Sequence, residues 1–113
     1  MTCFFCKIAN GEMDTDKVFE DDQVVAFRDI NPQAPTHVLI IPKKHISTMN
    51  DLEKDDSELI GQLFLSAKNI ARELGFSEDG YRTVFNCNGH GGQSVYHIHL
   101  HLLGGRQMGW PPG

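Results

Sequence analysis

Three histidines alternate with apolar residues near the C-terminal end of this 113-residue chain, in the run His97-Ile98-His99-Leu100-His101-Leu102-Leu103. In a β-strand, successive side chains point to opposite faces, so a strand here places the three imidazoles on one face and the apolar side chains on the other. The run predicts a half-buried strand over residues 96–103. Such a strand needs partner strands and an apolar layer against one face, which makes a sheet the central element of the fold.

A glycine-rich turn leads directly into this strand. Residues 89–92 read Gly-His-Gly-Gly and are followed by the polar side chains of Gln93 and Ser94. Glycine lets the backbone approach a ligand closely, and turn N–H groups that point inward form a pocket for an anion. We therefore expect donors for a phosphate beside a histidine that can attack the phosphorus. A transition-metal site is the alternative, since imidazole is a common metal ligand.

The remaining hydrophobic pattern predicts an α+β fold. Short β-like runs are expected at residues 17–20, 23–28, 36–41 and 81–86, and apolar residues recur at helical spacing from Leu59 to Leu74. A short helical turn is expected between Cys3 and Asn10. The expected architecture is a five-stranded antiparallel sheet with one long and one short helix, in a single domain of residues 1–113. Residues 104–113, which end in Trp-Pro-Pro-Gly, are expected to form an extended tail.

Composition narrows the classes of function. The formal net charge is −5, which leaves no basic surface for nucleic acid. No apolar run approaches the roughly 20 residues of a membrane helix, and no signal-peptide pattern is visible. Three cysteines, two of them in Cys3-Phe4-Phe5-Cys6, argue against a secreted disulfide framework. We expect a cytoplasmic protein without nucleic-acid or membrane partners, whose CxxC pair serves metal binding or redox chemistry.

The run at residues 97–103 resembles the histidine triad (HIT) motif, His-x-His-x-His followed by two apolar residues. The chain is similar to the HINT branch, the histidine triad nucleotide-binding proteins. The segments that carry this likeness are residues 26–37, 41–46, 91–96, 97–103, 104–108 and 110–113. The resemblance implies a HIT-like homodimer in which two five-stranded sheets join. It also implies a purine nucleoside phosphoramidase that hydrolyses the P–N bond of adenosine 5′-phosphoramidates.

The resemblance further implies which residues carry the reaction. His99, the middle histidine of the motif, is the expected nucleophile and forms a nucleotidyl-histidine intermediate. His101 is expected to hold the phosphate oxygens or to set the tautomer of His99, and His37 to lie behind the nucleophile and orient it. The hydroxyl of Ser94 is expected to contact the phosphate and the leaving group. No metal or other cofactor is required for this chemistry.

A site for AMP or GMP and the corresponding phosphoramidates is implied in the same way. Asp29 is expected to bind the ribose, since an acceptor-only carboxylate suits a diol. Phe27, Ile30 and Met13 are expected to wall the base, and an ordinary core role is the alternative for each. The expected nucleotide contacts are Asp29, Ile30, Phe27, Asn86, Gly92, Gln93, Ser94, His99 and His101.

Cys3 and Cys6 have the spacing of a zinc knuckle, but two thiolates do not complete a tetrahedral site. Some similar histidine triad proteins hold a structural zinc with a CxxC pair, the histidine of a Pro-Lys-x-His turn and the first histidine of the triad. Carried over to this sequence, the resemblance implies zinc ligands at Cys3, Cys6, His45 and His97. Two buried free thiols that act as small apolar side chains are the alternative.

Two other functions are kept as alternatives. The first is a dinucleoside polyphosphate hydrolase or nucleotidyl transferase of the same superfamily, which the segments 104–108 and 110–113 disfavour. The second is a metal-binding or scaffold protein in which His97, His99 and His101 jointly hold an ion. The turn at Gln93 and Ser94 disfavours that alternative, because a pure metal site has no use for a phosphate pocket.

Overall fold

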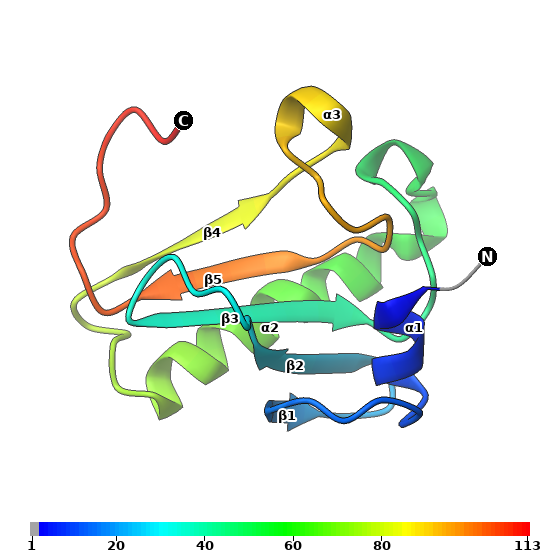
Figure 1. Cartoon of the computed structure of the whole chain (residues 1–113), viewed down its shortest axis with the longest axis horizontal. Helices are drawn as coiled ribbons and strands as arrows, with labels where there is room; N and C mark the ends of the chain where they lie inside the picture. Colours follow the sequence, from blue (N-terminus) through cyan, green and yellow to red (C-terminus); the bar gives the residue numbers. More distant parts are fainter. Residues whose placement is uncertain (1–2) are drawn as a thin grey trace.

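The computed structural model describes residues 3–113. The helices and strands are α1 (Phe4–Ala9), β1 (Lys17–Glu20), β2 (Val24–Arg28), β3 (Thr36–Pro42), α2 (Ser57–Glu73), β4 (Tyr81–Phe85), α3 (Asn88–Gly91) and β5 (Leu100–Gly104) (Figure 1). The five strands form one sheet in the order β1-β2-β3-β5-β4, and each neighbouring pair is antiparallel. The predicted α+β class and five-stranded antiparallel sheet are confirmed.

The long helix α2 packs across one face of the sheet. Its buried apolar side consists of Leu63, Ala67, Ile70 and Ala71. These residues recur at helical spacing and form one core cluster with strand residues such as Val38 and Leu100. The helix ends at Glu73, and Gly75 follows with φ +89°, the left-handed conformation that commonly terminates a helix.

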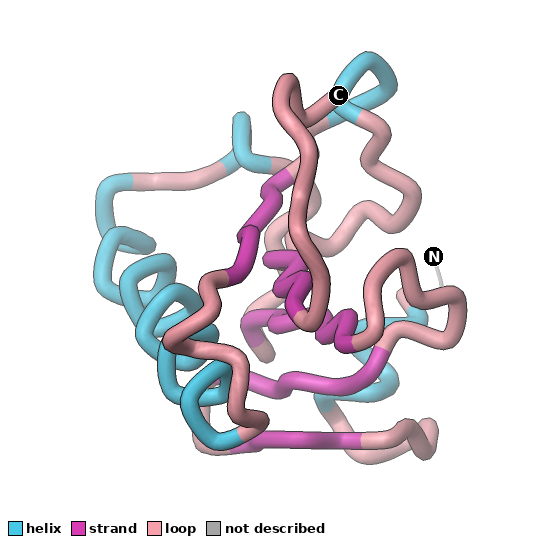
Figure 2. The backbone as a smooth tube through the Cα atoms, turned by 90° about the vertical axis from the view of Figure 1, so that its left-hand side faces the viewer, coloured by secondary structure: helices cyan, strands magenta, loops and turns pink. Residues whose placement is uncertain are grey.

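The opposite face of the sheet carries α1. Side chains alternate between the two faces of each strand, so Val25, Phe27 and Leu39 point to this side and pack against Phe5 and Ile8 of α1. Figure 2 shows α2 on one side of the strands and α1 with the loops on the other. Because α1 has only six residues, it is held in place by this packing rather than by its own helical stability.

The last strand is shorter than the histidine pattern predicts. β5 begins at Leu100, and residues 93–99 are irregular. In that segment the Ile98 N–H donates to the carbonyl of Ile46 at 2.8 Å. His97 and His99 therefore precede the strand, and His97 is fully buried. The expectation of three imidazoles in a row on one strand is wrong, because the segment pairs with the turn at Ile46 instead of extending the sheet.

The segments that connect the strands and the long helix contain short helical elements. The glycine-rich turn contains the short helix α3, which Gly92 caps with φ +81°. Two 3-10 turns, Met49–Asp51 and Lys54–Asp56, lie between β3 and α2. Residues 105–113 contain neither helix nor strand. Within residues 3–113, no helix combines the length and the apolar character that crossing a membrane requires.

Candidate functional site

A cavity of about 430 Å³ opens on the α1 side of the sheet. Its apolar lining includes Phe4, Phe5, Ile8, Met13, Phe27, Leu39 and Val95, and its polar lining includes Asp29, Ser94, His99 and His101. A largely apolar pocket with a few convergent polar groups is the usual form of a small-molecule site. The fold thus brings together residues from α1, β2, β3 and the segment before β5 that are far apart in the sequence.

His99 lies in this cavity with one ring nitrogen fixed. Its Nδ1 is 2.8 Å from the carbonyl oxygen of His97. A carbonyl only accepts, so Nδ1 carries the proton and Nε2 keeps a lone pair. Within residues 3–113 every fully buried side-chain nitrogen or oxygen has a hydrogen-bond partner, and His99 Nε2 has none. This nitrogen is therefore open to the cavity and is available as a nucleophile.

The ring of Phe5 stands against His99. The two ring centroids are 5.2 Å apart and the ring planes are at 89°, an edge-to-face arrangement. Phe5 also packs on Phe27 in the same geometry, with centroids 5.4 Å apart. The apolar wall of the cavity therefore restrains the imidazole from one side.

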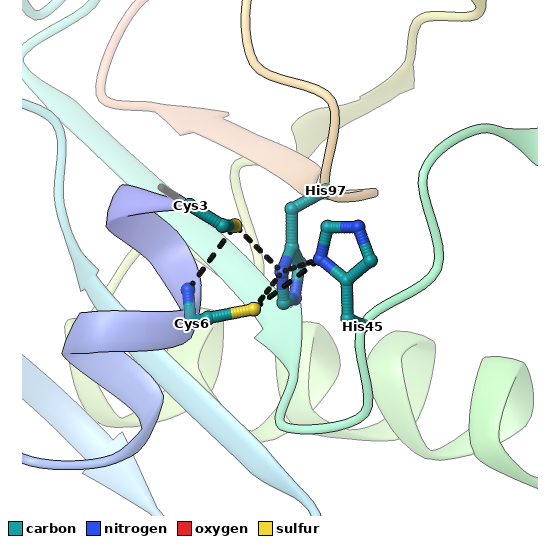
Figure 3. Close-up of side chains that lie close together, drawn as sticks. All are labelled: Cys3, Cys6, His45 and His97. Carbon is teal, nitrogen blue, oxygen red and sulfur yellow. Dashed lines mark hydrogen bonds between the residues drawn. The ribbon is translucent and has the colours of Figure 1, made fainter. Parts of the chain in front are cut away.

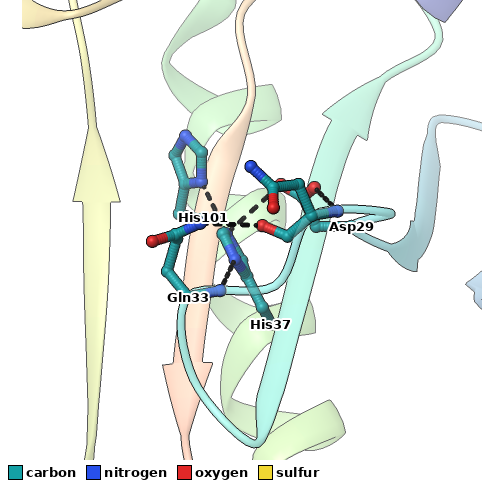
Figure 4. Close-up of polar contacts among 5 residues, drawn as sticks. Asp29, Gln33, His37 and His101 are labelled. Carbon is teal, nitrogen blue, oxygen red and sulfur yellow. Dashed lines mark hydrogen bonds and ion pairs between the residues drawn. The ribbon is translucent and has the colours of Figure 1, made fainter.

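His37 contacts His101 rather than His99. The Nε2 of His37 lies 2.9 Å from Nδ1 of His101, and the Gln33 N–H donates to the His37 Nδ1 at 3.0 Å (Figure 4). The expectation that His37 orients His99 directly is therefore corrected: β3 pairs Leu39 with His101, which brings His37 to the neighbouring ring. Burial lowers the pKa of His37, and burial with the nearby His99 and His37 lowers the pKa of His101 to about 4. Both rings are neutral at pH 7.

Asp29 lies at the polar end of the cavity, just after β2. Its Oδ1 accepts from the Asn31 N–H at 2.8 Å, and its Oδ2 is 3.5 Å from the His37 Nε2. Phe27 is buried in the wall, whereas Ile30 lines the mouth and is 99 % exposed. Core packing is therefore not the role of Ile30, and its side chain is free to contact a ligand.

Not every expected nucleotide contact lines the cavity. Of the described residues, the lining includes Ser94 but not Asn86, Gly92 or Gln93. The N–H groups of Gly92 and Gln93 donate to the carbonyls of Gly89 and Asn88, at 3.1 Å and 3.0 Å. The expectation that these two N–H groups are free to hold a phosphate is thus not met, because the end of α3 uses them.

The side chain of Gln93 has a different task. Its amide nitrogen donates to the carbonyls of Ser47 at 2.7 Å and Val95 at 3.1 Å, and its Oε1 accepts from the Asn88 N–H at 2.9 Å. These bonds connect α3, the turn after β3 and the segment that carries Ser94. From the sequence, Gln93 was expected only as a nucleotide contact, and this connection was not predicted.

The apolar contribution of α1 to the cavity was also missed. Phe4 and Ile8 are four residues apart, the spacing that places two side chains on one side of a helix, and both line the cavity with Phe5. The spacing of Phe4 and Ile8 is the sequence signal that could have predicted this apolar contribution.

A second cluster joins the start of α1 to the turns around it. Cys3 and Cys6, His45 after β3, and His97 before β5 place one ligand atom each within 4.8 Å of the others (Figure 3). The Nδ1 of His97 is 3.4 Å from the Cys3 Sγ and 3.5 Å from the Cys6 Sγ. The Nδ1 of His45 is 3.2 Å from the Cys6 Sγ and 3.2 Å from the His97 Nδ1. The four residues expected as metal ligands are therefore together.

The chemistry of this cluster fits a tetrahedral cation. The Nε2–H of His97 donates to the Pro42 carbonyl at 2.7 Å, so its Nδ1 presents a lone pair to the cluster. Tetrahedral zinc bonds of about 2.0 Å to nitrogen and 2.3 Å to sulfur place such ligand atoms about 3.3–3.5 Å apart, close to the separations found. Burial, followed by the adjacent Cys3 sulfur, raises the pKa of Cys6 to about 11. A cation favours the thiolate form and relieves the contact between the two Nδ1 atoms.

The three histidines of the motif have different surroundings. His97 belongs to the cysteine cluster and His101 to the His37 pair, while His99 presents to the cavity a ring nitrogen that has no hydrogen-bond partner within residues 3–113. A single ion held jointly by His97, His99 and His101 does not agree with these positions, so that alternative is excluded by the geometry.

Comparison with known proteins agrees with this arrangement. The family model described as "HIT domain" matches residues 10–108. The "Purine nucleoside phosphoramidase" of Escherichia coli (strain K12) is 53% identical over 105 residues, which cover 93% of this chain and 88% of that protein. The "14 kDa zinc-binding protein" of Zea mays is 54% identical over 111 residues, which cover 96% and 86%. Among solved structures, a HIT family hydrolase from Legionella pneumophila has a TM-score of 0.97 at 65% identity and covers 99% of this chain and 100% of that one.

The region matched by the family model contains the sheet, the three histidines of the motif and the cavity lining other than that of α1, and the similarity to the relatives extends over nearly the full length of both chains. On this sequence and structural similarity, the chain belongs to the HIT-domain family.

Proposed function

We propose that this protein is a hydrolase that cleaves the P–N bond of purine nucleoside 5′-phosphoramidates and releases the nucleoside monophosphate and an amine. The observation that carries the proposal is the state of His99: Nδ1 donates to the His97 carbonyl, and Nε2 faces the cavity with its lone pair. The identity to a purine nucleoside phosphoramidase of Escherichia coli supports the choice of substrate class.

In the first step, the His99 Nε2 attacks phosphorus and forms a P–N bond to the ring as the bond to the substrate nitrogen breaks. The departing nitrogen takes a proton and leaves as an amine. Ser94, which lines the cavity, supplies a hydroxyl that relays this proton from water. The Nδ1–H bond to the His97 carbonyl stabilises the positive charge that the ring acquires.

In the second step, water attacks the phosphorus of the nucleotidyl-histidine and the bond to Nε2 breaks. The products are the nucleoside monophosphate, a proton that passes to solvent and the unmodified His99, so the enzyme is ready for another cycle. His101, neutral at pH 7, contributes hydrogen bonding rather than charge to the phosphoryl group.

The nucleoside part of the substrate occupies the apolar compartment. Phe27, Ile8 and the exposed Ile30 contact the purine, and Asp29 accepts hydrogen bonds from the ribose hydroxyls. Asp29 Oδ2 is suited to this because its contact with the His37 Nε2, at 3.5 Å, is long and leaves the oxygen able to accept further hydrogen bonds. Asn86, Gly92 and Gln93 act on the phosphate side indirectly, through the position of Ser94.

The Cys3, Cys6, His45 and His97 cluster holds a structural zinc ion. The donor set of two thiols and two imidazoles and the separations of 3.2–3.5 Å support this assignment. Zinc bound there supplies a crosslink between α1 and the segment before β5, and the reaction itself needs no cofactor. Because the thiols must stay reduced to bind zinc, we infer that the protein works in the reducing cytoplasm.

The protein acts as a homodimer in which the edge strands β4 meet. β4 is at the edge of the sheet and presents Tyr81 to solvent, and the nearby α2 exposes Phe64. Exposed strand edges and apolar side chains of this kind are usually covered by a partner. In the tail, Trp110 is 83 % exposed and reaches the partner's site. Light scattering during gel filtration gives the oligomeric state directly.

The activity is tested with adenosine 5′-phosphoramidate and a diadenosine polyphosphate as competing substrates, with AMP release followed by chromatography. We expect faster turnover of the phosphoramidate and, with a substrate labelled in its adenosine, a labelled nucleotidyl protein after alkaline quench, because the P–N bond to histidine is labile to acid. His99→Ala abolishes both signals, while His90→Ala, which removes an exposed imidazole on α3, leaves them unchanged. Faster cleavage of the diadenosine polyphosphate, or turnover by the His99→Ala protein, would contradict the proposal.

A further inference from the structure

The loop between β2 and β3, residues 29–35, lies beside the segment that follows β5 (Figure 1). Because β3 and β5 are antiparallel, Thr36 at the start of β3 is opposite Gly104 at the end of β5. The residues that precede β3 therefore meet the residues that follow β5. A Cβ atom on Gly105 would lie only 2.8 Å from the Cβ of Pro35, so the two segments are in close contact.

Hydrophobic packing contributes little to the position of this loop. Residues 30–33 are exposed to solvent, and Ala34 is the first buried residue after Phe27. A segment that buries little apolar surface depends on hydrogen bonds for its conformation. The conformation matters because the loop begins with Asp29, the carboxylate at the polar end of the cavity.

A series of three hydrogen bonds connects Arg106 with Asp29. The Arg106 Nη2 donates to the Gln33 carbonyl at 2.9 Å, and the Gln33 side-chain amide donates to the Asn31 carbonyl at 3.1 Å. The Asn31 N–H in turn donates to the Asp29 Oδ1 at 2.8 Å. Among residues 3–113, Arg106 is the one hydrogen-bond partner of this loop that lies outside both the loop and β3.

The guanidinium of Arg106 binds two backbone carbonyls. Its Nη1 donates to the Gln107 carbonyl at 3.1 Å, in addition to the bond from Nη2 to Gln33. In the part of the chain that the structure describes, Arg106 forms no ion pair. Arg82 lines the same polar surface pocket but donates to the Gly109 carbonyl at 2.8 Å instead of the loop. Arg106 therefore joins the segment after β5 to the loop, and Arg82 offers a matched comparison.

We propose that Arg106 is a positioning residue for nucleotide binding, which holds residues 29–35 so that the Asp29 carboxylate is in place to accept from the ribose hydroxyls. The contact with the ribose rests on the proposed function, whereas the support of the loop does not. Without the Arg106 bond, the bonds of Gln33 and Asn31 open more often, and Asp29 must be ordered when the ligand binds. Ordering a loop on binding lowers affinity, so Arg106 increases the affinity for nucleotides that carry the ribose diol.

Amide hydrogen exchange measured by NMR tests the support of the loop without a nucleotide. The N–H groups of Asn31 and Gln33 are hydrogen-bonded and should exchange slowly in the unsubstituted protein. Arg106→Met keeps an aliphatic side chain but lacks the N–H donors, and both amides should exchange about tenfold faster in this variant. Arg106→Lys retains a donor and should recover most of the protection, and Arg82→Met should behave as the unsubstituted protein. Equal exchange in Arg106→Met and the unsubstituted protein would overturn the proposal.

Calorimetric titration with AMP and with 2′,3′-dideoxy-AMP, which lacks both ribose hydroxyls, tests the effect on binding. Arg106→Met should raise the dissociation constant of AMP about fivefold and that of the dideoxy nucleotide by less than about twofold. Arg106→Lys should restore most of the preference for AMP, and Arg82→Met should retain it. In a protein that already carries Asp29→Asn, Arg106→Met should cause no further loss of preference.

The two measurements separate this inference from the proposed function. An unsubstituted protein that binds both nucleotides equally would refute the ribose contact of Asp29, and with it both proposals. Faster exchange in Arg106→Met with an unchanged preference for AMP would overturn the role of Arg106 and leave the proposed function intact. Equal weakening of both nucleotides would also overturn it, because that result indicates a general structural loss.

Discussion

His97 and His99 are joined by a hydrogen bond through the backbone: the carbonyl oxygen of His97 accepts from the Nδ1 of His99 at 2.8 Å. The side chain of the same His97 belongs to the cluster with Cys3, Cys6 and His45. One residue thus contributes a proposed metal ligand through its side chain and orients the proposed nucleophile through its carbonyl. The cysteine–histidine cluster and the cavity are therefore expected to affect each other.

Replacing Cys3 and Cys6 together by serine should remove zinc and destabilise the protein. A ligand at a thousand times its dissociation constant stabilises a protein by about 4 kcal/mol, and a loss of this order is expected. kcat should also fall severalfold, because α1 carries Phe5 against the His99 ring and His97 loses its anchor. Zinc content by mass spectrometry, thermal unfolding and phosphoramidate turnover measure the three effects.

Cys87→Ser is the matched control for this pair. Cys87 is the third cysteine and lies outside the cluster, at the start of α3. The Cys87→Ser protein should bind about one zinc per chain and should be as stable as the unsubstituted protein. Zinc content that is the same in the double variant and in the control would refute the ligand assignment.

The strands and the long helix could be predicted from the sequence because each is encoded by a local pattern of apolar residues. The β-branched run at 36–41 and the apolar spacing from Leu59 to Leu74 each reflect one element packing on one core. The start of β5 was not predicted, since it depends on the hydrogen bond between Ile98 and Ile46, which are 52 positions apart. A tertiary contact of this kind leaves no trace in the alternation of His and apolar residues.

The sequence predicted which residues form the site better than it predicted which of them contact each other. The structure brings the four cluster residues together and places His99, His101, Asp29 and Ser94 in the lining of one cavity, while the roles that the resemblance implies for them stay predictions. The partner of His37 was not predicted, because it depends on where β5 begins and on the register of β5 with β3. β5 contains His101 but not His99, and neither feature is visible in the motif. The same holds for the side-chain contacts of Gln93.

Gln93→Leu should destabilise the protein and slow turnover. The substitution leaves the carbonyls of Ser47 and Val95 and the N–H of Asn88 without their partner, at a cost of about 1–3 kcal/mol. The segment with Ser94 loses its restraint, so kcat should fall more than the affinity for AMP. Urea unfolding and steady-state kinetics measure both. Gln23→Leu, at an exposed position, is the control, and equal behaviour of the two variants would contradict the role of Gln93.

The stability should depend on pH through His101. Burial, with the nearby His99 and His37, lowers the pKa of His101 to about 4, compared with about 6.5 in an unfolded chain. Between these values the unfolded chain binds a proton that the folded chain does not, so the free energy of unfolding decreases as the pH falls from 6.5 to 4. The shift corresponds to at most about 3 kcal/mol, which solvent screening at this half-buried ring reduces to about 1–2 kcal/mol.

His101→Gln removes this titrating group and should flatten the dependence. Urea unfolding of both proteins at several pH values between 4 and 7 gives the comparison. The stability of the parent should fall more steeply than that of the variant in this window, since the other titrating groups are common to both. Parallel curves would mean that the pKa of His101 in the folded protein is close to that in the unfolded chain.

Leu63→Ala should lower stability without changing the chemistry. Leu63 is fully buried between α2 and the sheet, and truncating a leucine in such a core costs about 2–5 kcal/mol through lost burial and the cavity left behind. The proposed active site is on the opposite face of the sheet, so kcat at a temperature where both proteins are folded should be unchanged. Lys68→Ala, on the exposed side of the same helix, should change stability by no more than about 0.5 kcal/mol. A clear decrease of kcat in the folded Leu63→Ala protein would contradict the prediction. It would mean that the core on one face of the sheet and the cavity on the other are not independent.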